Sequence, residues 1–163
     1  MESKLLLAGA IAATLLAVGC GSGTGTSQAS PSPIASPSVA AAGTTIAVAT
    51  DAKLGQILVD GKGMTLYLFV KDTGPISTCY DACAQIWPPV LTTDTPKAGT
   101  GIAAELLGTT TRNDGKLEVT YNHHPLYYII QDKKAGDTTG QGVDGFGGLW
   151  YVLSPSGAPI TTK

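Results

Sequence analysis

The feature that most constrains the fold of this chain is a phrase that occurs twice. "LYLFVKD", Leu66 to Asp72, is followed sixty positions later by "LYYIIQD", Leu126 to Asp132. Each copy leads into a glycine-containing loop and then a tryptophan, Trp87 in the first half and Trp150 in the second. Because two copies are too few for a solenoid, the duplication predicts one domain with pseudo-two-fold symmetry.

The residues around the first phrase have the chemistry of a β-strand. Aliphatic and aromatic side chains occupy both alternating sets of positions from 64 to 70, so both faces of this strand are apolar. Such a strand lies inside a sandwich or under a covering layer. Turn signals at 60–63, 113–115 and 122–124 indicate hairpins. The further strands we expect are Thr45–Thr50, Leu54–Asp60, Lys116–Tyr121 and Leu149–Leu153, and the candidate short helices are Thr78–Ile86 and Ile102–Leu106.

The predicted fold class is therefore mainly β. We expect a small sandwich or barrel-like domain in which two repeated strand-hairpin units, at about 54–90 and 114–155, are related by a pseudo-two-fold axis. One or two short helices complete it. Each phrase should form an equivalent strand in its own half, ended by an equivalent turn at its aspartate.

The N-terminal residues 1–19 read as a signal peptide. Leu5 to Gly19 is apolar except for Thr14, and a helix of this length spans roughly 22 Å, short of the ~30 Å hydrocarbon core. The sequence "AVGC", ending at Cys20, resembles the lipobox of bacterial lipoproteins. That resemblance implies cleavage after Gly19 and acylation of Cys20. The alternatives are an uncleaved anchor, or an ordinary secretory signal in which Cys20 is incidental.

Residues 20–45 and 46–163 differ sharply in composition. The first segment is almost wholly Gly, Ser, Thr, Pro and Ala and cannot bury enough apolar surface to offset the entropy of ordering, so we predict a tether. The second segment suits one β domain. Net charge is −2 and no basic run occurs, which argues against nucleic acid as a partner.

Several blocks of the chain together resemble one known family. "YLFVKD" fits the motif Tyr-x-(Phe/Trp/Tyr)-x-x-Asp, and "STCYDACAQIWPP", "GTTTRNDGKLEVTYN", "PLYYIIQD" and "GQGVDGFGGLWYV" follow in order. These blocks are similar to bacterial secreted-repeat lipoproteins. The resemblance covers Gly55 to Gly157 and implies a cell-envelope lipoprotein whose biochemical role is undefined. Three residues depart from the pattern: Ile129 replaces the second aromatic of the motif, and Asp81 and His123 stand where glycine is expected.

The aspartates that end the two phrases, Asp72 and Asp132, are predicted to fix turns by accepting hydrogen bonds from backbone N–H groups two residues on. A catalytic or ligand-binding role is the alternative. The aromatic residues are predicted to form a core. Some of them could instead line a groove between the halves that takes a ligand, peptide or glycan. The aromatic residues in question are Tyr67, Phe69, Trp87, Tyr121, Tyr127, Tyr128, Trp150 and Tyr151.

Cys79 and Cys83 remain once Cys20 is lipidated, and in an oxidising compartment they are predicted to form a disulfide with a distorted turn before Trp87. A redox-active dithiol and a pair of metal ligands are the alternatives.

The two histidines and a glycine-rich segment complete the candidates. His123 and His124 are predicted to be solvated turn residues, and they are weak candidates for a metal site. "GQGVDG", Gly140 to Gly145, matches a dinucleotide fingerprint by letter, but a strand is expected after it rather than the required helix. We therefore predict a close-packed glycine loop.

These observations favour a membrane-anchored, non-enzymatic binding or scaffolding module of the cell envelope. We expect no cofactor, and a partner that is an envelope protein, peptide or glycan. The expected location is the outer face of the cytoplasmic membrane or the outer membrane. The alternative function is an envelope redox or electron-transfer accessory that uses Cys79, Cys83 and the nearby aromatics.

Overall fold

The computed structural model describes residues 43–162, which all belong to one unit. The predicted signal peptide, the lipidation at Cys20 and most of the tether therefore lie outside the described residues. Among residues 43–162 no helix is long and apolar enough to cross a membrane.

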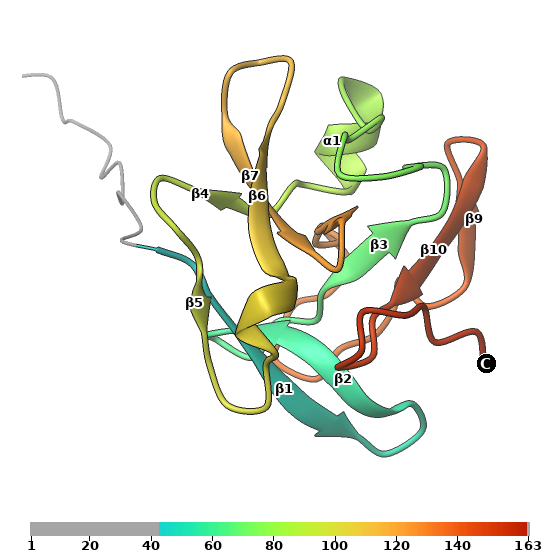
Figure 1. Ribbon diagram of the computed structural model, residues 1–163. Coiled ribbons are helices and arrows are strands. Elements are labelled where there is room, and N and C mark those ends of the chain that lie inside the picture. The colour runs from blue at the N-terminus through green and yellow to red at the C-terminus, as the bar shows by residue number, and fades with distance from the viewer. Residues whose placement is uncertain (1–42, 163) are drawn as a thin grey trace, which may run out of the picture. The chain divides into compact units, whose positions relative to one another are not determined.

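Short strands form three small sheets (Figure 1). The first sheet has the order β2 (Gly55–Asp60), β1 (Thr45–Asp51), β5 (Lys97–Ala98). The second has the order β3 (Tyr67–Phe69), β10 (Gly148–Val152), β9 (Val143–Gly145). The third has the order β4 (Leu91–Thr92), β7 (Leu117–Tyr121), β6 (Leu107–Thr111), with β8 (His124–Pro125) also paired to β7. The helices are α1 (Ala82–Ile86) and the 3-10 turn η1 (Ala104–Leu106). The predicted mainly β class is confirmed.

The second copy of the phrase differs from the prediction because it is not a regular strand. The backbone N–H groups of Leu126, Tyr127 and Tyr128 donate to carbonyl oxygens of Val119, Tyr67 and Pro88 respectively. Since these acceptors belong to three different segments, no continuous ladder can form. Tyr127 makes only isolated bridges, to Tyr67 and Pro89.

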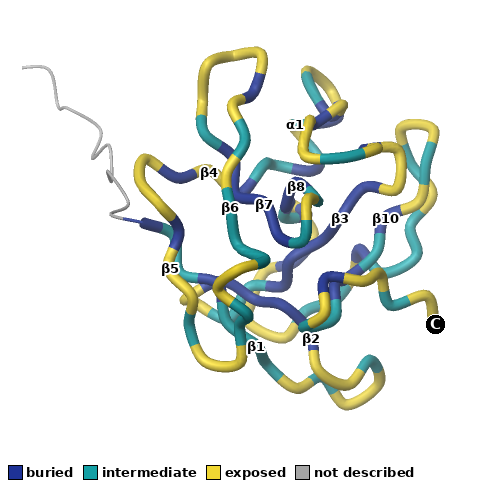
Figure 2. The backbone as a smooth tube through the Cα atoms, viewed as in Figure 1, coloured by how far each residue is buried: buried dark blue, intermediate teal, exposed yellow. Residues whose placement is uncertain are grey.

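The pseudo-two-fold relation of the halves is centred on the backbone of the two motif tyrosines. Tyr67 N–H donates to the Tyr127 carbonyl and Tyr127 N–H donates to the Tyr67 carbonyl, both at 2.9 Å. Both side chains are completely buried. Figure 2 shows that the buried backbone follows β3, β7 and β8 through the middle of the domain, whereas the hairpin tips are exposed.

Tight turns hold several residues in the left-handed region. Asn122 (φ 47°) and His123 (φ 64°) form the two-residue turn between β7 and β8, as a type I′ hairpin requires. Asp81, just before α1, has φ 49° and ψ −120°. Glycine adopts such conformations without a steric penalty, whereas L-residues are strained in them.

Candidate functional site

The motif tyrosines and aspartates are joined across the two repeats. The Tyr67 hydroxyl donates a hydrogen bond to Asp132 Oδ2 at 2.7 Å, and the Tyr127 hydroxyl donates to Asp72 Oδ2 at 2.6 Å. All four residues are buried. Burial, reinforced by the neighbouring carboxylates, raises the pKa of both tyrosine hydroxyls, so both remain protonated donors. Each repeat therefore supplies the tyrosine that satisfies the aspartate of the other.

The second oxygen of each aspartate holds the loop that follows it. Asp72 Oδ1 accepts hydrogen bonds from Thr78 N (2.7 Å) and Thr78 Oγ1 (2.6 Å). Asp132 Oδ1 accepts the equivalent pair from Thr139 N (3.0 Å) and Thr139 Oγ1 (2.6 Å). The prediction that each aspartate accepts from the N–H group two residues later was wrong. The N–H donors lie six residues after Asp72 and seven residues after Asp132. Each aspartate closes a wide loop rather than a tight turn.

Four core aromatic rings form a continuous row between the two tyrosine–aspartate pairs. Trp87 and Trp150 lie face to face at 3.9 Å between ring centroids, with an interplanar angle of 4°. Tyr67 packs against Trp87 with 5.5 Å between ring centroids, and Tyr127 packs against Trp150 with 5.1 Å between ring centroids. In both pairs the ring planes are nearly perpendicular. The alternative that these four rings line an open groove is wrong, since none is more than 1% exposed.

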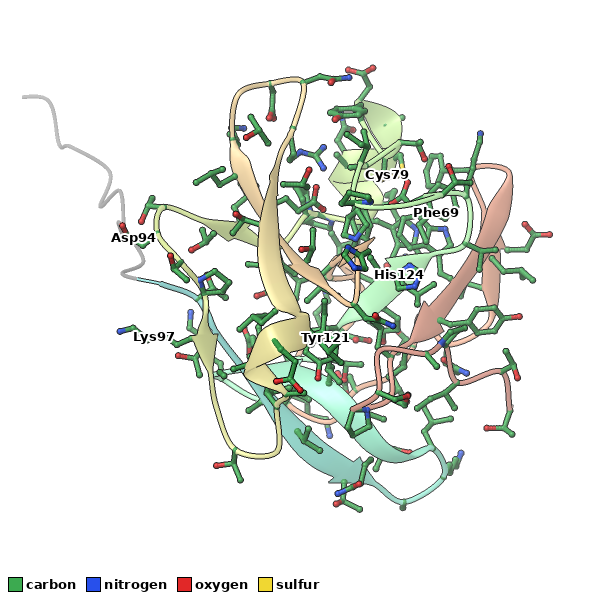
Figure 3. The ribbon with its side chains drawn as sticks, viewed as in Figure 1. Phe69, Cys79, Asp94, Lys97, Tyr121 and His124 are labelled. Atoms are coloured by element: carbon green, nitrogen blue, oxygen red, sulfur yellow. A yellow bond between two sulfur atoms is a disulfide. The ribbon has the colours of Figure 1, made fainter. Side chains whose placement is uncertain are left out.

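The outer members of the aromatic set are less symmetric. Phe69, on β3 (Figure 3), stacks on Trp150 at 4.1 Å. Its counterpart in the second phrase, Ile129, is buried in the same cluster but is aliphatic. Tyr121 is buried in the second core cluster, whereas Tyr128 and Tyr151 are only half-buried.

Gly140, the first residue of the predicted glycine loop, is buried against the stack. A Cβ atom there would lie 2.8 Å from Trp87 Cη2 and 2.8 Å from Tyr67 Cε1. Its N–H also donates to the Tyr67 hydroxyl at 3.3 Å. A close-packed glycine is therefore required at this position, and β10 rather than a helix follows the loop.

The first aspartate has a buried polar network that the second does not share. The Tyr127 hydroxyl lies 2.7 Å from Ser77 Oγ, which accepts from Arg112 Nη1 at 2.9 Å. Arg112 Nη1 also donates to Glu118 Oε2 at 2.6 Å. The Arg112 side chain is 1% exposed and that of Glu118 is 0% exposed. The repeats are thus distinguished by a buried ion pair beside Asp72.

Burial dominates the electrostatics of this pair. It raises the pKa of Glu118 to about 7, although Arg112 acts in the opposite direction. Three buried polar atoms have no hydrogen-bond partner among residues 43–162: Arg112 Nε, Glu118 Oε1 and His124 Nδ1. Burying the charges of Arg112 and Glu118 therefore costs desolvation free energy.

Cys79 and Cys83 are joined by a disulfide with a Cα–Cα distance of 5.2 Å, as predicted. The bond spans the start of α1, and the Trp87 N–H that ends the helix donates to the Cys83 carbonyl at 2.7 Å. The Cys79 carbonyl accepts a 2.7 Å hydrogen bond from Arg112 Nη2. The disulfide therefore positions both Trp87 and the ion pair.

The histidines occupy two different environments. His123 is exposed at the turn, whereas His124 (Figure 3) is half-buried on β8, and burial lowers its pKa. In the part of the chain that the structure describes, no three His, Cys, Asp or Glu residues are grouped so that they could hold a metal ion.

Sequence reasoning missed Ser77, Thr78, Thr139, Arg112 and Glu118. The available signal was the pair Arg112 and Glu118, which flanks the "NDG" turn at diagonal positions of the hairpin, since Glu118 lies opposite Thr110. A charged residue on an otherwise apolar strand such as "LEVTY" is also informative.

The fold and the cluster define a class of protein: a two-repeat β-domain in which the motif of each repeat is completed by the other. The chain belongs to the family described as a secreted repeat of unknown function, whose model matches residues 48–91 and 108–154. Membership places the domain outside the cytoplasm, in the envelope or beyond it. No curated protein and no solved structure matched the chain.

Proposed function

We propose that this protein is a lipid-anchored, non-enzymatic binding or scaffolding module of the cell envelope. The observation that carries the proposal is the reciprocal bonding of the motif. Both oxygens of Asp72 and of Asp132 accept hydrogen bonds from tyrosine and threonine side chains inside the domain. The motif residues therefore stabilise the fold, and we place ligand binding on the surface of the domain.

The geometry also argues against acid-base catalysis by the motif. A general acid or base must reach the proton of a bound substrate. Asp72 is 4% exposed and Asp132 is 7% exposed, so each would have to leave its three hydrogen bonds to do so. Such bonds to a charged group contribute about 1.5–3 kcal/mol each, which makes the exposed state unfavourable.

Membrane attachment is proposed through Cys20, on the outer face of the cytoplasmic membrane or on the outer membrane. Each buried CH₂ of an acyl chain contributes about 0.8 kcal/mol, so several chains on one residue hold a protein stably on a bilayer. The uncharged, Pro-containing residues after Cys20 suit a spacer between the bilayer and the β domain.

Metabolic labelling with an alkyne fatty acid tests the anchor. The wild-type chain and a Ser22→Ala control should take up label and sediment with membranes. A Cys20→Ser variant should do neither. Label on Cys20→Ser, or an unlabelled wild-type chain, would refute lipidation at this residue.

One observation favours electron transfer as a second candidate function. The stacked pair Trp87 and Trp150, with an edge contact to a tyrosine on each side, forms an unbroken path between two tyrosines, each hydrogen-bonded to a carboxylate. A one-electron oxidant would take one electron from Tyr127 while its hydroxyl proton passes to Asp72, leaving a neutral tyrosyl radical and a carboxylic acid. Flash oxidation with a ruthenium(III) polypyridyl complex, followed by electron paramagnetic resonance, should then detect tyrosyl radical. Equal yield from Trp87→Phe and wild-type protein would exclude transfer through the stack.

A further inference from the structure

We propose that the outer edge of β6 binds an extended peptide segment of another envelope polypeptide. The segment adds a strand to the β4-β7-β6 sheet and places two successive basic side chains in hollows on the two faces of that sheet. This inference rests on the binding role proposed above, and it names the surface and the chemistry of the partner.

The hydrogen-bond pattern of the β6–β7 ladder identifies the free groups. Asn122 N–H donates to the Leu106 carbonyl and Arg112 N–H donates to the Lys116 carbonyl, at the two ends of the ladder. Bonded and non-bonded pairs alternate in an antiparallel ladder, so Gly108 and Thr110 face β7 with their backbone groups. Thr109 and Thr111 consequently direct their N–H and C=O groups away from β7.

The opposite side of β7 supports the same assignment. The Val119 N–H donates to the Val90 carbonyl, and the Val119 carbonyl accepts from Leu126. Val119 is the register partner of Thr109, so the backbone of Thr109 receives no bond from it. Both Thr109 and Thr111 are exposed. Within residues 43–162 no group pairs with their outward backbone atoms.

The edge carries none of the usual devices that prevent pairing with another chain. β6 reads "LGTTT", with no lysine, no proline and no other charged side chain. Protected edges typically carry such residues or a bulge. An unprotected edge is a template for strand addition, in which main-chain hydrogen bonds supply affinity and pockets for alternate side chains supply specificity.

A hollow lies on each face of the sheet beside this edge. The first, of about 310 Å³, is lined by Asp94, Pro96 and Leu117 together with Gly108 and Thr109. Asp94 comes from the loop after β4, at the rim of the domain (Figure 3).

The second hollow, of about 300 Å³, is lined by Pro75, Glu105, Thr120 and His123, again with Gly108 and Thr109. Thr120 and the Leu117 of the first hollow are three positions apart on β7, so their side chains lie on opposite faces. Gly108 contributes no side chain to either hollow. The strand edge is therefore flanked by space on both faces.

The charge of the hollows selects the occupant. One acidic residue lines each hollow, Asp94 the first and Glu105 the second, and no lysine or arginine lines either. Successive side chains of an added strand point to opposite faces. Two consecutive lysines therefore place one ammonium group in each hollow, and complementary charge strengthens association.

Fluorescence anisotropy tests the proposal on the full chain in mild detergent. The probe is a labelled octapeptide, Thr-Val-Thr-Lys-Lys-Thr-Val-Thr, and the comparison peptides carry Glu-Glu at the centre or N-methyl groups on alternate residues. The Lys-Lys peptide should bind at least about tenfold more tightly than either comparison peptide, a difference of about 1.4 kcal/mol. Equal affinity for the N-methylated peptide would overturn strand addition, and absence of binding by the Lys-Lys peptide would overturn the proposal as a whole.

Two variants of β6 sharpen the test. Thr109→Pro removes one outward N–H without touching the ladder to β7, and edge positions of this kind tolerate proline. It should weaken binding at least about tenfold, whereas Thr109→Ala should stay within about twofold of wild type. Unchanged binding by a folded Thr109→Pro variant would refute the site. If that variant does not fold, the N-methylated peptide decides the question alone.

A third pair of variants tests the charges. Asp94→Asn and Glu105→Gln should each weaken binding of the Lys-Lys peptide and leave binding of an Ala-Ala peptide unchanged. Sedimentation of the chain without peptide tests the competing occupant: a dimer abolished by Thr109→Pro would assign the edge to a second copy and overturn the peptide proposal. These results do not depend on Cys20, so loss of lipid labelling and loss of peptide binding report separate failures.

Discussion

Asp81 and His123 each hold a backbone conformation that favours glycine, at φ 49° and 64°. Both stand where the resemblance to secreted-repeat lipoproteins implies glycine. Strain of this kind costs about 1–3 kcal/mol, and the added freedom of glycine in the unfolded state offsets about 0.4–1 kcal/mol. We therefore expect Asp81→Gly and His123→Gly each to raise the free energy of unfolding by about 1 kcal/mol in urea titrations. Asp81→Ala retains the Cβ atom and should give no gain; an equal gain from it would contradict the strain argument.

The reciprocal tyrosine bonds predict a cross-repeat coupling. Tyr67→Phe and Tyr127→Phe each leave a buried carboxylate oxygen without its hydroxyl donor, so each should lower the free energy of unfolding by about 1–3 kcal/mol. Tyr151→Phe, at a half-buried position, is the control and should be nearly neutral. Double-mutant cycles combine Tyr67→Phe with Asp132→Asn or with Asp72→Asn. The coupling energy of Tyr67 with Asp132 should exceed about 0.5 kcal/mol, and Tyr67 should not couple to Asp72. Coupling to Asp72 alone would contradict the arrangement.

Glu118 predicts an unusual pH dependence. Its pKa in the folded state, about 7, lies above the ordinary value of 4.5, so the folded protein holds a proton that the unfolded chain releases between these pH values. The free energy of unfolding should therefore fall as pH rises from about 4.5 to about 7, by on the order of 3 kcal/mol. His124, whose pKa is lowered, contributes with the opposite sign.

The Glu118→Gln variant separates these two contributions. Urea unfolding of wild type and variant across this pH range should give a difference that grows steadily with pH. A constant difference would show that Glu118 does not titrate there.

At this scale the sequence identified the important side chains but not their partners. Tyr67, Asp72, Tyr127 and Asp132 stand out because the phrase repeats. Which tyrosine meets which aspartate depends on contacts between residues 55 and 65 positions apart, and no local pattern encodes these distances.

Among the elements, α1 depends on the disulfide rather than on its own helical propensity. A helix of five residues is far below the length that is stable alone. Closing so small a ring contributes about 2 kcal/mol through the unfolded state. Because Cys79 is 0% and Cys83 7% exposed, we expect mild reductant to leave the bond intact in the native protein and to cleave it in urea. Intact mass after alkylation measures this; rapid reduction of the native protein would instead favour the redox alternative.

The strands themselves were predictable where local signals agreed. β1, β2, β7 and β10 combine apolar or β-branched runs with clear turns, and all four occur within two residues of their expected bounds. β6 was missed because "LGTTT" has a glycine and no apolar alternation. It becomes a strand by pairing with β7 across the "NDG" turn, so its cause is the hairpin partner and not a pattern within its own residues.

For the whole molecule, the crossing of the motifs predicts one cooperative unfolding transition. Neither half can satisfy its buried tyrosine and aspartate alone, and Trp87 of one half stacks on Trp150 of the other. Differential scanning calorimetry should give equal calorimetric and van't Hoff enthalpies. Two separate transitions, or a van't Hoff enthalpy well below the calorimetric value, would show that the repeats melt independently.

The exchanged tyrosines also bear on the origin of the domain. Every contact between Tyr67 and Asp132 has a counterpart between Tyr127 and Asp72, which is the pattern of an isologous interface in a symmetric homodimer. A single-repeat ancestor would have made these contacts between two identical subunits. Gene fusion would then free the copies to diverge and allow an asymmetry such as the Arg112–Glu118 pair, which belongs to the second repeat and lies beside Asp72 of the first. Substitutions in one motif should accordingly be inherited together with substitutions in the other.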